Sequence, residues 1–159
     1  QIIQYKELIP EMVGMFQKEM AERIIAPPGS RTYGVISVLT QAWYIGTRVI
    51  DVPPSAFTPP PKVNSLVIKL TRRTDDNGIH DPKAFIRVVK QSFGMRRKML
   101  RNNLKALFID QSLLEGEFFN KRAEQLSLED YVNLTNLYLS QKYVAGGIFI
   151  CGLPIKEIF

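Results

Sequence analysis

The sequence has one cysteine, Cys151, and one histidine, His80, among its 159 residues. A single cysteine excludes a disulfide framework and a cysteine-based zinc site, and one histidine offers little for metal ligation, so no metal is expected. No basic-then-apolar leader opens the chain, and its longest apolar run is shorter than the ~20 residues that a membrane span needs. These shortages predict a cytoplasmic protein that is not embedded in a membrane.

Acidic residues are missing from one stretch, Lys83 to Lys105, which we call the basic segment. It contains eight basic residues and no acidic one, whereas the rest of the chain holds 13 basic and 15 acidic residues. The net charge of +6 and the isoelectric point near 9.5 therefore come from this segment. A charge concentrated in this way indicates a polyanionic partner such as a nucleic acid.

The spacing of the basic segment predicts two helices, over 81–92 and 95–108. Asp81 would cap the first helix, with Pro82 at its first position. In the second, basic residues four apart would share one stripe and meet the phosphates of a nucleic acid. A solvated helix face is the alternative, and it is common for runs of charge. The candidate RNA-binding residues are Arg96, Arg97, Lys98, Arg101 and Lys105.

Proline, by contrast, is concentrated in one place, with five prolines between Val52 and Pro61. Proline fixes φ and lacks a backbone donor, so this stretch is predicted to be a stiff loop, neither helix nor central strand. Phe57 is its one large side chain, and an aromatic ring on such a frame is a platform for a planar ligand. Proline-rich turns before strands are also common as scaffolding, and composition leaves both interpretations open.

Around this loop the residue pattern predicts an α/β chain with a boundary at the polar stretch 71–81. The apolar residues within 1–8 suggest a helix there. Before the boundary we expect a strand over 11–17, helices over 18–26 and 33–44, and antiparallel strands over 48–52 and 63–70. After it, beyond the two basic helices, we expect short helices over 112–119, 122–126 and 127–139. Residues 141–159 are apolar and contain several glycines, and the pattern predicts no particular structure for them.

Four motifs in order carry a family resemblance: QKEMAER at 17–23, PGSRTYGVISV at 28–38, VPPSAFTPPPKVNS at 52–65 and FGMRRKMLRNNL at 93–104. Together they resemble the KsgA (RsmA) small-subunit rRNA adenine dimethyltransferases. The FTPPPKV pattern is also similar to that of the erythromycin-resistance methylases, whereas the Phe-x-x-Arg-Arg-Lys stretch favours the KsgA branch.

The resemblance implies S-adenosylmethionine-dependent N6,N6-dimethylation of two adjacent adenines near the 3′ end of 16S rRNA, with the 30S subunit as partner. It implies an α/β fold in which residues 1–73 are the C-terminal half of a Rossmann-like class I methyltransferase domain. Residues 79–140 would then be a small all-α domain that docks on rRNA, followed by the atypical apolar tail 141–159. Phe57 matches the aromatic of the family's Phe-x-Pro motif and would stack on the target base, with Pro59, Pro61 and Lys62 as further substrate contacts.

Three family motifs have no equivalent in the sequence: the glycine-rich cofactor loop, the acidic residue for the cofactor ribose, and the Asn-apolar-Pro-aromatic motif. We therefore expect no cofactor on this chain alone, and no activity from it alone. A sheet without its other strands would expose an edge, which predicts a missing N-terminal fragment, self-association, or a chain cut from a longer product. The alternative function is a non-catalytic RNA- or ribosome-binding module that retains only the docking half.

Overall fold

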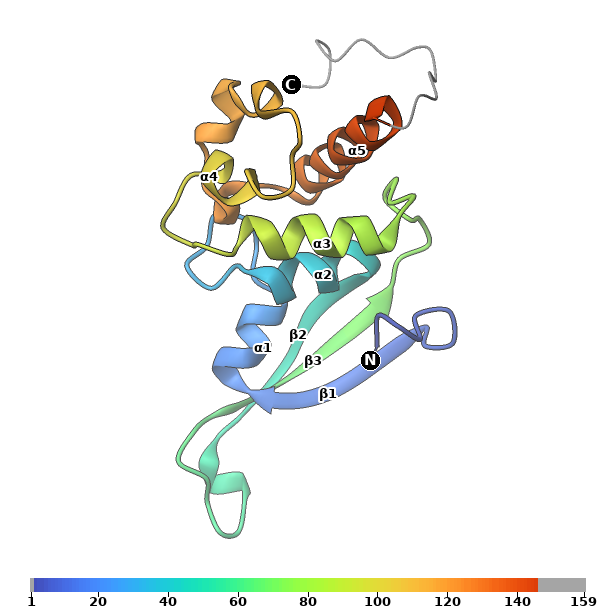
Figure 1. The fold of residues 1–159 in the computed structure, drawn as a ribbon. Helices are drawn as coiled ribbons and strands as arrows, with labels where there is room; N and C mark the ends of the chain where they lie inside the picture. The colour runs from blue at the N-terminus through green and yellow to red at the C-terminus, as the bar shows by residue number, and fades with distance from the viewer. Residues whose placement is uncertain (1, 146–159) are drawn as a thin grey trace. The chain divides into compact units, whose positions relative to one another are not determined.

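The computed structural model describes residues 2–145, and the chain divides into two compact units, residues 1–77 and 78–159 (Figure 1). The first unit contains a three-stranded sheet and two helices. In the described part of the second unit, the regular elements are all helical. The predicted tail 141–159 begins within the last helix, and its remainder, which includes Cys151, lies outside the described residues.

The sheet is built around β3 (Ser65–Arg72), with β1 (Glu11–Gln17) and β2 (Tyr44–Val52) on either side. Both outer strands run antiparallel to β3. The predicted antiparallel pair on either side of the proline-rich loop is therefore confirmed. β2 starts earlier than predicted, because the backbone is already extended at Tyr44.

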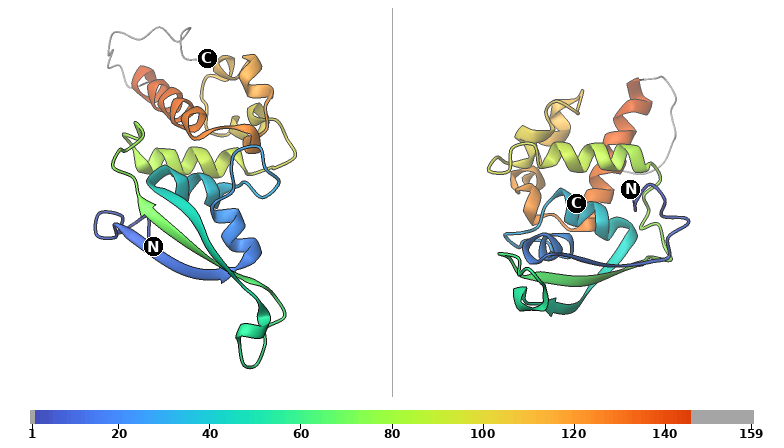
Figure 2. Two further views of the ribbon diagram at one scale, coloured as in Figure 1. Left: turned by 180° about the vertical axis from the view of Figure 1, so that it is seen from behind. Right: turned by 90° about the horizontal axis from the view of Figure 1, so that it is seen from below.

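Two helices, α1 (Lys18–Ile24) and α2 (Val35–Trp43), cover one face of this sheet (Figures 1 and 2). Gly46 of β2 lies opposite Leu70 and faces the same side, where an added Cβ would approach the Ile25 side chain to 2.5 Å. Glycine is required there because the segment after α1 packs directly on the strand. The alternate residues of β3 on this face form the core of the unit, each at most 2% exposed: Leu66, Ile68 and Leu70.

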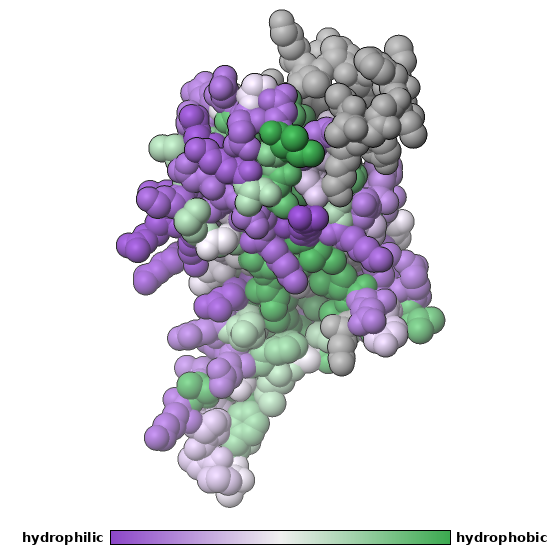
Figure 3. Space-filling model, in the orientation of Figure 1, coloured by the Kyte–Doolittle hydropathy of each residue, from purple (hydrophilic) through white to green (hydrophobic). Residues whose placement is uncertain are grey.

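The opposite face of the sheet has no covering layer among the described residues. Met15 and Ile50 flank Val67 in the register of the sheet, and both are more than half exposed. Val13 and Ile45 are also at least half exposed. Figure 3 looks onto the other side of the first unit, the side of its helices, where hydrophobic and hydrophilic residues are mixed. An apolar sheet face of this kind is typical of a surface that contacts further polypeptide.

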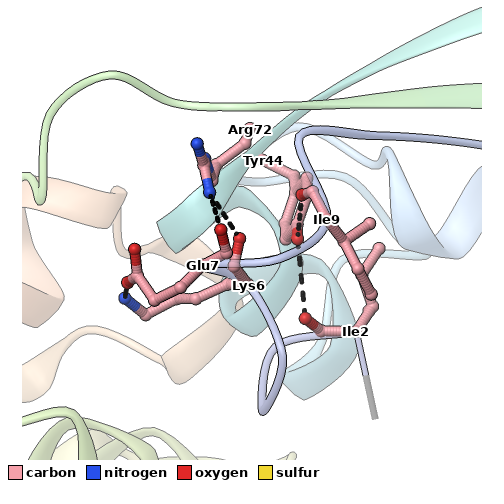
Figure 4. A network of polar contacts seen from close by, with 6 residues as sticks. All are labelled: Ile2, Lys6, Glu7, Ile9, Tyr44 and Arg72. Atoms are coloured by element: carbon pink, nitrogen blue, oxygen red, sulfur yellow. Dashed lines mark hydrogen bonds and ion pairs between the residues drawn. The ribbon is translucent and has the colours of Figure 1, made fainter.

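The helix suggested for residues 1–8 is not found: residues 2–8 form turns instead, and two side chains hold this segment in place (Figure 4). Arg72 donates from Nη1 to the carbonyl oxygens of Lys6 and Glu7, at 2.8 Å each. The Tyr44 hydroxyl donates to the carbonyl oxygen of Ile9 at 3.0 Å. Burial raises the pKa of Tyr44, so its stability contribution is complete below the ordinary tyrosine range and is lost only as pH rises through the folded value.

The second unit packs α3 (Pro82–Ser92) against α5 (Leu128–Ala145) and the short α4 (Leu100–Leu104). The predicted cap of α3 is confirmed, since Asp81 accepts a hydrogen bond from the Ala84 amide at 2.9 Å. A reciprocal pair caps the start of α5: the Ser127 amide donates to Asp130 at 2.8 Å, and the Asp130 amide donates to Ser127 at 3.1 Å.

Between α4 and α5 the chain forms three turns of 3₁₀ helix rather than the two short helices predicted. They are η2 (Gln111–Leu114), η3 (Glu117–Asn120) and η4 (Ala123–Gln125). Each of these turns buries one apolar side chain and ends within three or four residues, which is too short for an amphipathic α-helix. In the described residues no helix is long and apolar enough to cross a membrane.

Candidate nucleic-acid interface

The proline-rich loop extends from the ends of β2 and β3, away from the rest of the first unit (Figure 1). One 3₁₀ turn, Pro54–Ala56, is closed by hydrogen bonds from the Ala56 and Phe57 amides to the carbonyl oxygens of Pro53 and Pro54, at 3.1 Å each. Phe57 follows in extended conformation and is half-buried. The loop therefore holds Phe57 on a closed turn, next to the exposed residues Pro59, Pro61 and Lys62.

Lys18, the first residue of α1 after β1, contacts both ends of this loop. Its backbone amide donates to the carbonyl oxygen of Asn64 at 2.9 Å, and its Nζ lies 3.0 Å from the carboxylate of Asp51. Asn64 is the last loop residue before β3, and Asp51 lies at the end of β2. One residue thus connects the two ends of the loop to the first helix.

The carboxylate of Asp51 also accepts three hydrogen bonds from the Arg48 guanidinium, two at 2.7 Å and one at 3.0 Å, and Arg48 lies 3.5 Å from Glu22 of α1. These bonds from Arg48, and then that from Lys18, hold the pKa of Asp51 below its ordinary value. A lowered pKa means that the contribution of Asp51 to stability is present above the ordinary aspartate range and is lost only as pH falls through the folded value. The anchor of the loop is therefore intact at neutral pH.

A cleft of about 370 Å³ lies beside this anchor. Lys62 is the one predicted substrate residue that lines it, whereas Phe57, Pro59 and Pro61 do not. The other lining residues are Gln17, Lys18, Glu19, Glu22, Pro54, Val63 and Asn64. The four predicted loop residues therefore share one loop but do not converge on one cleft.

The basic segment lies in the second unit, and one part of its predicted structure is wrong. Residues 94–98, which carry Arg96, Arg97 and Lys98, form turns, and α4 begins only at Leu100. Arg101 is in α4, and Lys105 follows its last residue. The predicted continuous stripe on a helix over 95–108 therefore does not exist, and the basic side chains project from an exposed loop and one short helix.

The reason is the side chain of Asn103, which is 2% exposed. Its amide nitrogen donates to the carbonyl oxygens of Ser92 and Met95, at 2.7 and 3.2 Å, and its Oδ1 accepts from the Met95 amide at 3.0 Å. These bonds satisfy backbone groups that a helix would otherwise pair. Asn103 thus stabilises the loop that presents the arginines, and apolar periodicity gives no sign of it.

Replacing Asn103 with alanine is expected to destabilise the protein by about 1–3 kcal/mol, because buried backbone groups at Ser92 and Met95 lose their partner. It should also weaken RNA binding, since the loop with Arg96 and Arg97 loses its fixed conformation. Chemical denaturation and RNA titration would measure the two effects. Asn102→Ala is the matched control, since Asn102 is the exposed neighbour. Equal effects of both substitutions would contradict this role of Asn103.

The structure also places residues beside the basic segment that the sequence did not indicate. The Leu100 amide donates to the carbonyl oxygen of Lys121 at 2.8 Å, and Arg101 donates to the side chain of Asn120. The carboxylate of Glu124 lies 3.8 Å from Arg96, so an acidic residue from η4 partly offsets the positive charge. No sequence signal links these positions, because the contacts depend on how the 3₁₀ turns fold back on α4.

Metal ligation has no support in the described part of the chain, where no three histidine, cysteine, aspartate or glutamate side chains gather in a group that could hold an ion. The chemistry offered by the two units is instead an aromatic ring on a rigid loop and a set of guanidinium and ammonium groups. Stacking on bases and pairing with phosphates are the interactions that such groups make with nucleic acids.

Comparison with known proteins agrees with this chemistry. The chain is 49% identical over 136 residues to the ribosomal RNA small subunit methyltransferase A of Cytophaga hutchinsonii, an alignment that covers 86% of this chain and 53% of the relative. It is 51% identical over 132 residues to the Bacteroides fragilis protein of the same name, covering 82% of this chain and 48% of the relative. The chain therefore spans about half the length of these relatives.

Two solved structures show which fold the chain shares. A dimethyladenosine transferase from Plasmodium falciparum matches with a TM-score of 0.74 and 25% identity, over 92% of this chain and 62% of that one. The 23S rRNA methyltransferase ErmE matches with a TM-score of 0.57 at 19% identity, over 84% of this chain and 56% of that one, and supports the fold alone. The predicted α/β methyltransferase fold is thereby confirmed.

The family model for ribosomal RNA adenine dimethylase matches residues 1–140, nearly the whole of the described chain. The resemblance carried by the four sequence motifs is therefore confirmed, and the chain belongs to the ribosomal RNA adenine dimethylase family.

Proposed function

We propose that the chain is the C-terminal part of an enzyme that dimethylates N6 of two adjacent adenines near the 3′ end of 16S rRNA. The observation that carries this proposal is the position of Phe57, a half-buried aromatic ring in extended backbone on a loop anchored at both ends by Lys18. A ring held in this way can stack on a base without losing conformational freedom on binding. The names of the relatives support rRNA as the substrate class.

In this proposal the target adenine leaves its helix and lies against Phe57, because a stacked base cannot reach a methyl donor in a pocket. Pro59 and Pro61 form the wall beside the ring, and Lys62 contacts the backbone of the substrate. The nucleophile is the exocyclic amine, whose lone pair is delocalised into the adenine ring and needs orientation by hydrogen-bond acceptors. No group of this chain is assigned to that step.

S-adenosylmethionine would supply the methyl group in the longer enzyme, but the residues of this chain do not fit it. No two glycines in residues 2–145 are close enough to form a Gly-x-Gly loop, and β1 leads directly into α1 without such a loop. We therefore infer that the chain alone neither binds the cofactor nor transfers a methyl group, and no step is assigned through the cofactor here.

In this proposal the two units have different roles. Residues 1–73 would be the back half of the catalytic domain, and the helices of residues 79–140 would dock on the rRNA of the 30S subunit. Arg96, Arg97, Lys98, Arg101 and Lys105 are the proposed contacts to phosphate. A cytoplasmic location is part of this proposal, since the substrate is the ribosomal subunit. The exposed sheet face of Met15 and Ile50 would contact the missing N-terminal half or a second copy of the chain.

A non-catalytic module that binds RNA or the ribosome is the second candidate, favoured by the position of the basic segment in a helical unit separate from Phe57. Labelled S-adenosylmethionine and unmethylated 30S subunits distinguish the two. Methyl transfer by the longer protein, with subunit binding but no transfer by this chain, is the result expected for a part of the enzyme. Subunit binding without transfer by the longer protein would support the module.

A further inference from the structure

A cleft in the second unit is lined by residues to which the proposed function gives no role. It has a volume of about 800 Å³ and lies in the second unit, over η3 and the start of α5. Its walls carry two aromatic rings, an ammonium group, two side-chain amides and two carboxylates. The lining residues that the argument uses are Glu117, Phe118, Asn120, Lys121, Gln125 and Asp130.

The ring of Phe118 is held in place although it is only half-buried. It packs edge-to-face on Phe119, with 5.2 Å between ring centroids and 90° between planes, and Phe119 is 3% exposed. The Nζ of Lys121 lies 5.0 Å from the centroid of Phe118. A ring fixed by a buried neighbour and paired with an exposed cation is a surface on which a further flat group can stack.

This cleft is continuous with the basic segment. The Leu100 amide donates to the carbonyl oxygen of Lys121 at 2.8 Å, and Arg101 reaches the side chain of Asn120 on the cleft wall. The lining carboxylate of Asp130 is occupied by the capping bond from Ser127. Lys121 on the cleft wall and Arg101 beside it therefore balance the two lining carboxylates, Glu117 and Asp130.

We propose that the cleft binds one unpaired nucleotide of the RNA substrate, with its base stacked on Phe118 and its phosphate near Lys121. An unpaired base is required because RNA bases inside a duplex have their faces covered by their neighbours. The cation–π contact of Lys121 would be exchanged for a phosphate contact, which is favourable because stacking of a base contributes more than an exposed cation–π pair. Glu117 and Gln125 offer an acceptor and an amide to the edge of the base. This proposal rests on RNA binding by the proposed function.

The test is binding of a short single-stranded RNA that carries 2-aminopurine, measured with the longer protein and with this chain. Phe118→Ala should weaken binding about tenfold, as expected for the loss of one stacked base, without changing the salt dependence. Lys121→Gln should weaken binding and also flatten the salt dependence. Ile109→Ala, which removes a side chain that is 75% exposed elsewhere in the same unit, is the matched control and should have no effect.

Phe118→Trp keeps an aromatic ring and should retain affinity, with quenching of its emission when RNA is added. The only native tryptophan, Trp43, is buried in the first unit and supplies a constant background. Unchanged binding by Phe118→Ala, absence of quenching in Phe118→Trp, or equal weakening for a duplex of the same length would each overturn the proposal. If Arg96, Arg97 and Arg101 are needed for binding but Phe118 is not, this inference fails and the proposed function stands. If neither set matters, both fail.

Discussion

Phe57→Ala in the longer enzyme is expected to lower the rate of rRNA methylation 10- to 100-fold, with little change in stability. This decrease in rate corresponds to the loss of one base-stacking contact, which contributes about 1–3 kcal/mol. Folding should be nearly unaffected, because Phe57 is only half-buried on an exposed loop and makes no part of the core. Methylation of unmethylated 30S subunits, with thermal unfolding alongside, measures both quantities.

Two further variants make this result specific for stacking. Phe57→Tyr keeps the ring and should retain most of the activity. Val63→Ala removes an exposed apolar side chain from the same loop, where Val63 is 46% exposed, and should leave methylation unchanged. Near-normal turnover by Phe57→Ala, or an equal loss in Val63→Ala, would identify the loop as scaffolding between two strands.

The triple substitution Arg96→Gln, Arg97→Gln and Arg101→Gln is expected to weaken RNA binding on the order of 100-fold at low salt. Each arginine lost removes a charge-assisted contact of about 1 kcal/mol or more, and the three lie in one loop and the adjoining helix turn. The slope of log affinity against log salt should decrease by about 2, since three phosphate contacts release counterions in the wild type. A titration series at several salt concentrations gives both values.

The matched control is Lys83→Gln, Arg87→Gln and Lys90→Gln, which removes the same charge from exposed positions of α3. If net charge alone attracted the RNA, the two triple variants would bind equally weakly. A larger loss from the loop variant is the result that assigns the contacts to Arg96, Arg97 and Arg101. Binding unchanged from wild type in the loop variant would show that these arginines are a solvated surface.

Several elements of the fold can be predicted from short sequence patterns. Alternation of apolar residues predicts β3, Asp81 followed by Pro82 predicts the start of α3, and the concentration of proline predicts a rigid connection. Each of these signals acts within a few residues, so no tertiary contact has to be known. The four motifs added the family, which composition could not indicate.

Long-range contacts explain what the sequence did not predict. Apolar spacing over 95–108 fits a helix, but the buried amide of Asn103 binds backbone groups eight and eleven residues earlier and keeps that stretch open. The pairing of Glu124 with Arg96 and the cleft beside Phe118 depend in the same way on chain segments that meet only after folding. The sequence therefore could not show that the basic segment is interrupted by an exposed loop, or that Glu124 lies beside Arg96.

The position of β3 between β1 and β2 has a consequence for how the sheet forms. Pairing β2 with β3 closes only the proline-rich loop, from Val52 to Ser65, whereas pairing β1 with β3 closes the much longer chain from Gln17 to Ser65. Prolines restrict the unfolded chain, so less conformational entropy is lost when the shorter loop closes. The residues that present Phe57 thus also favour early formation of the hairpin, and β1 then adds to a strand that is already in place.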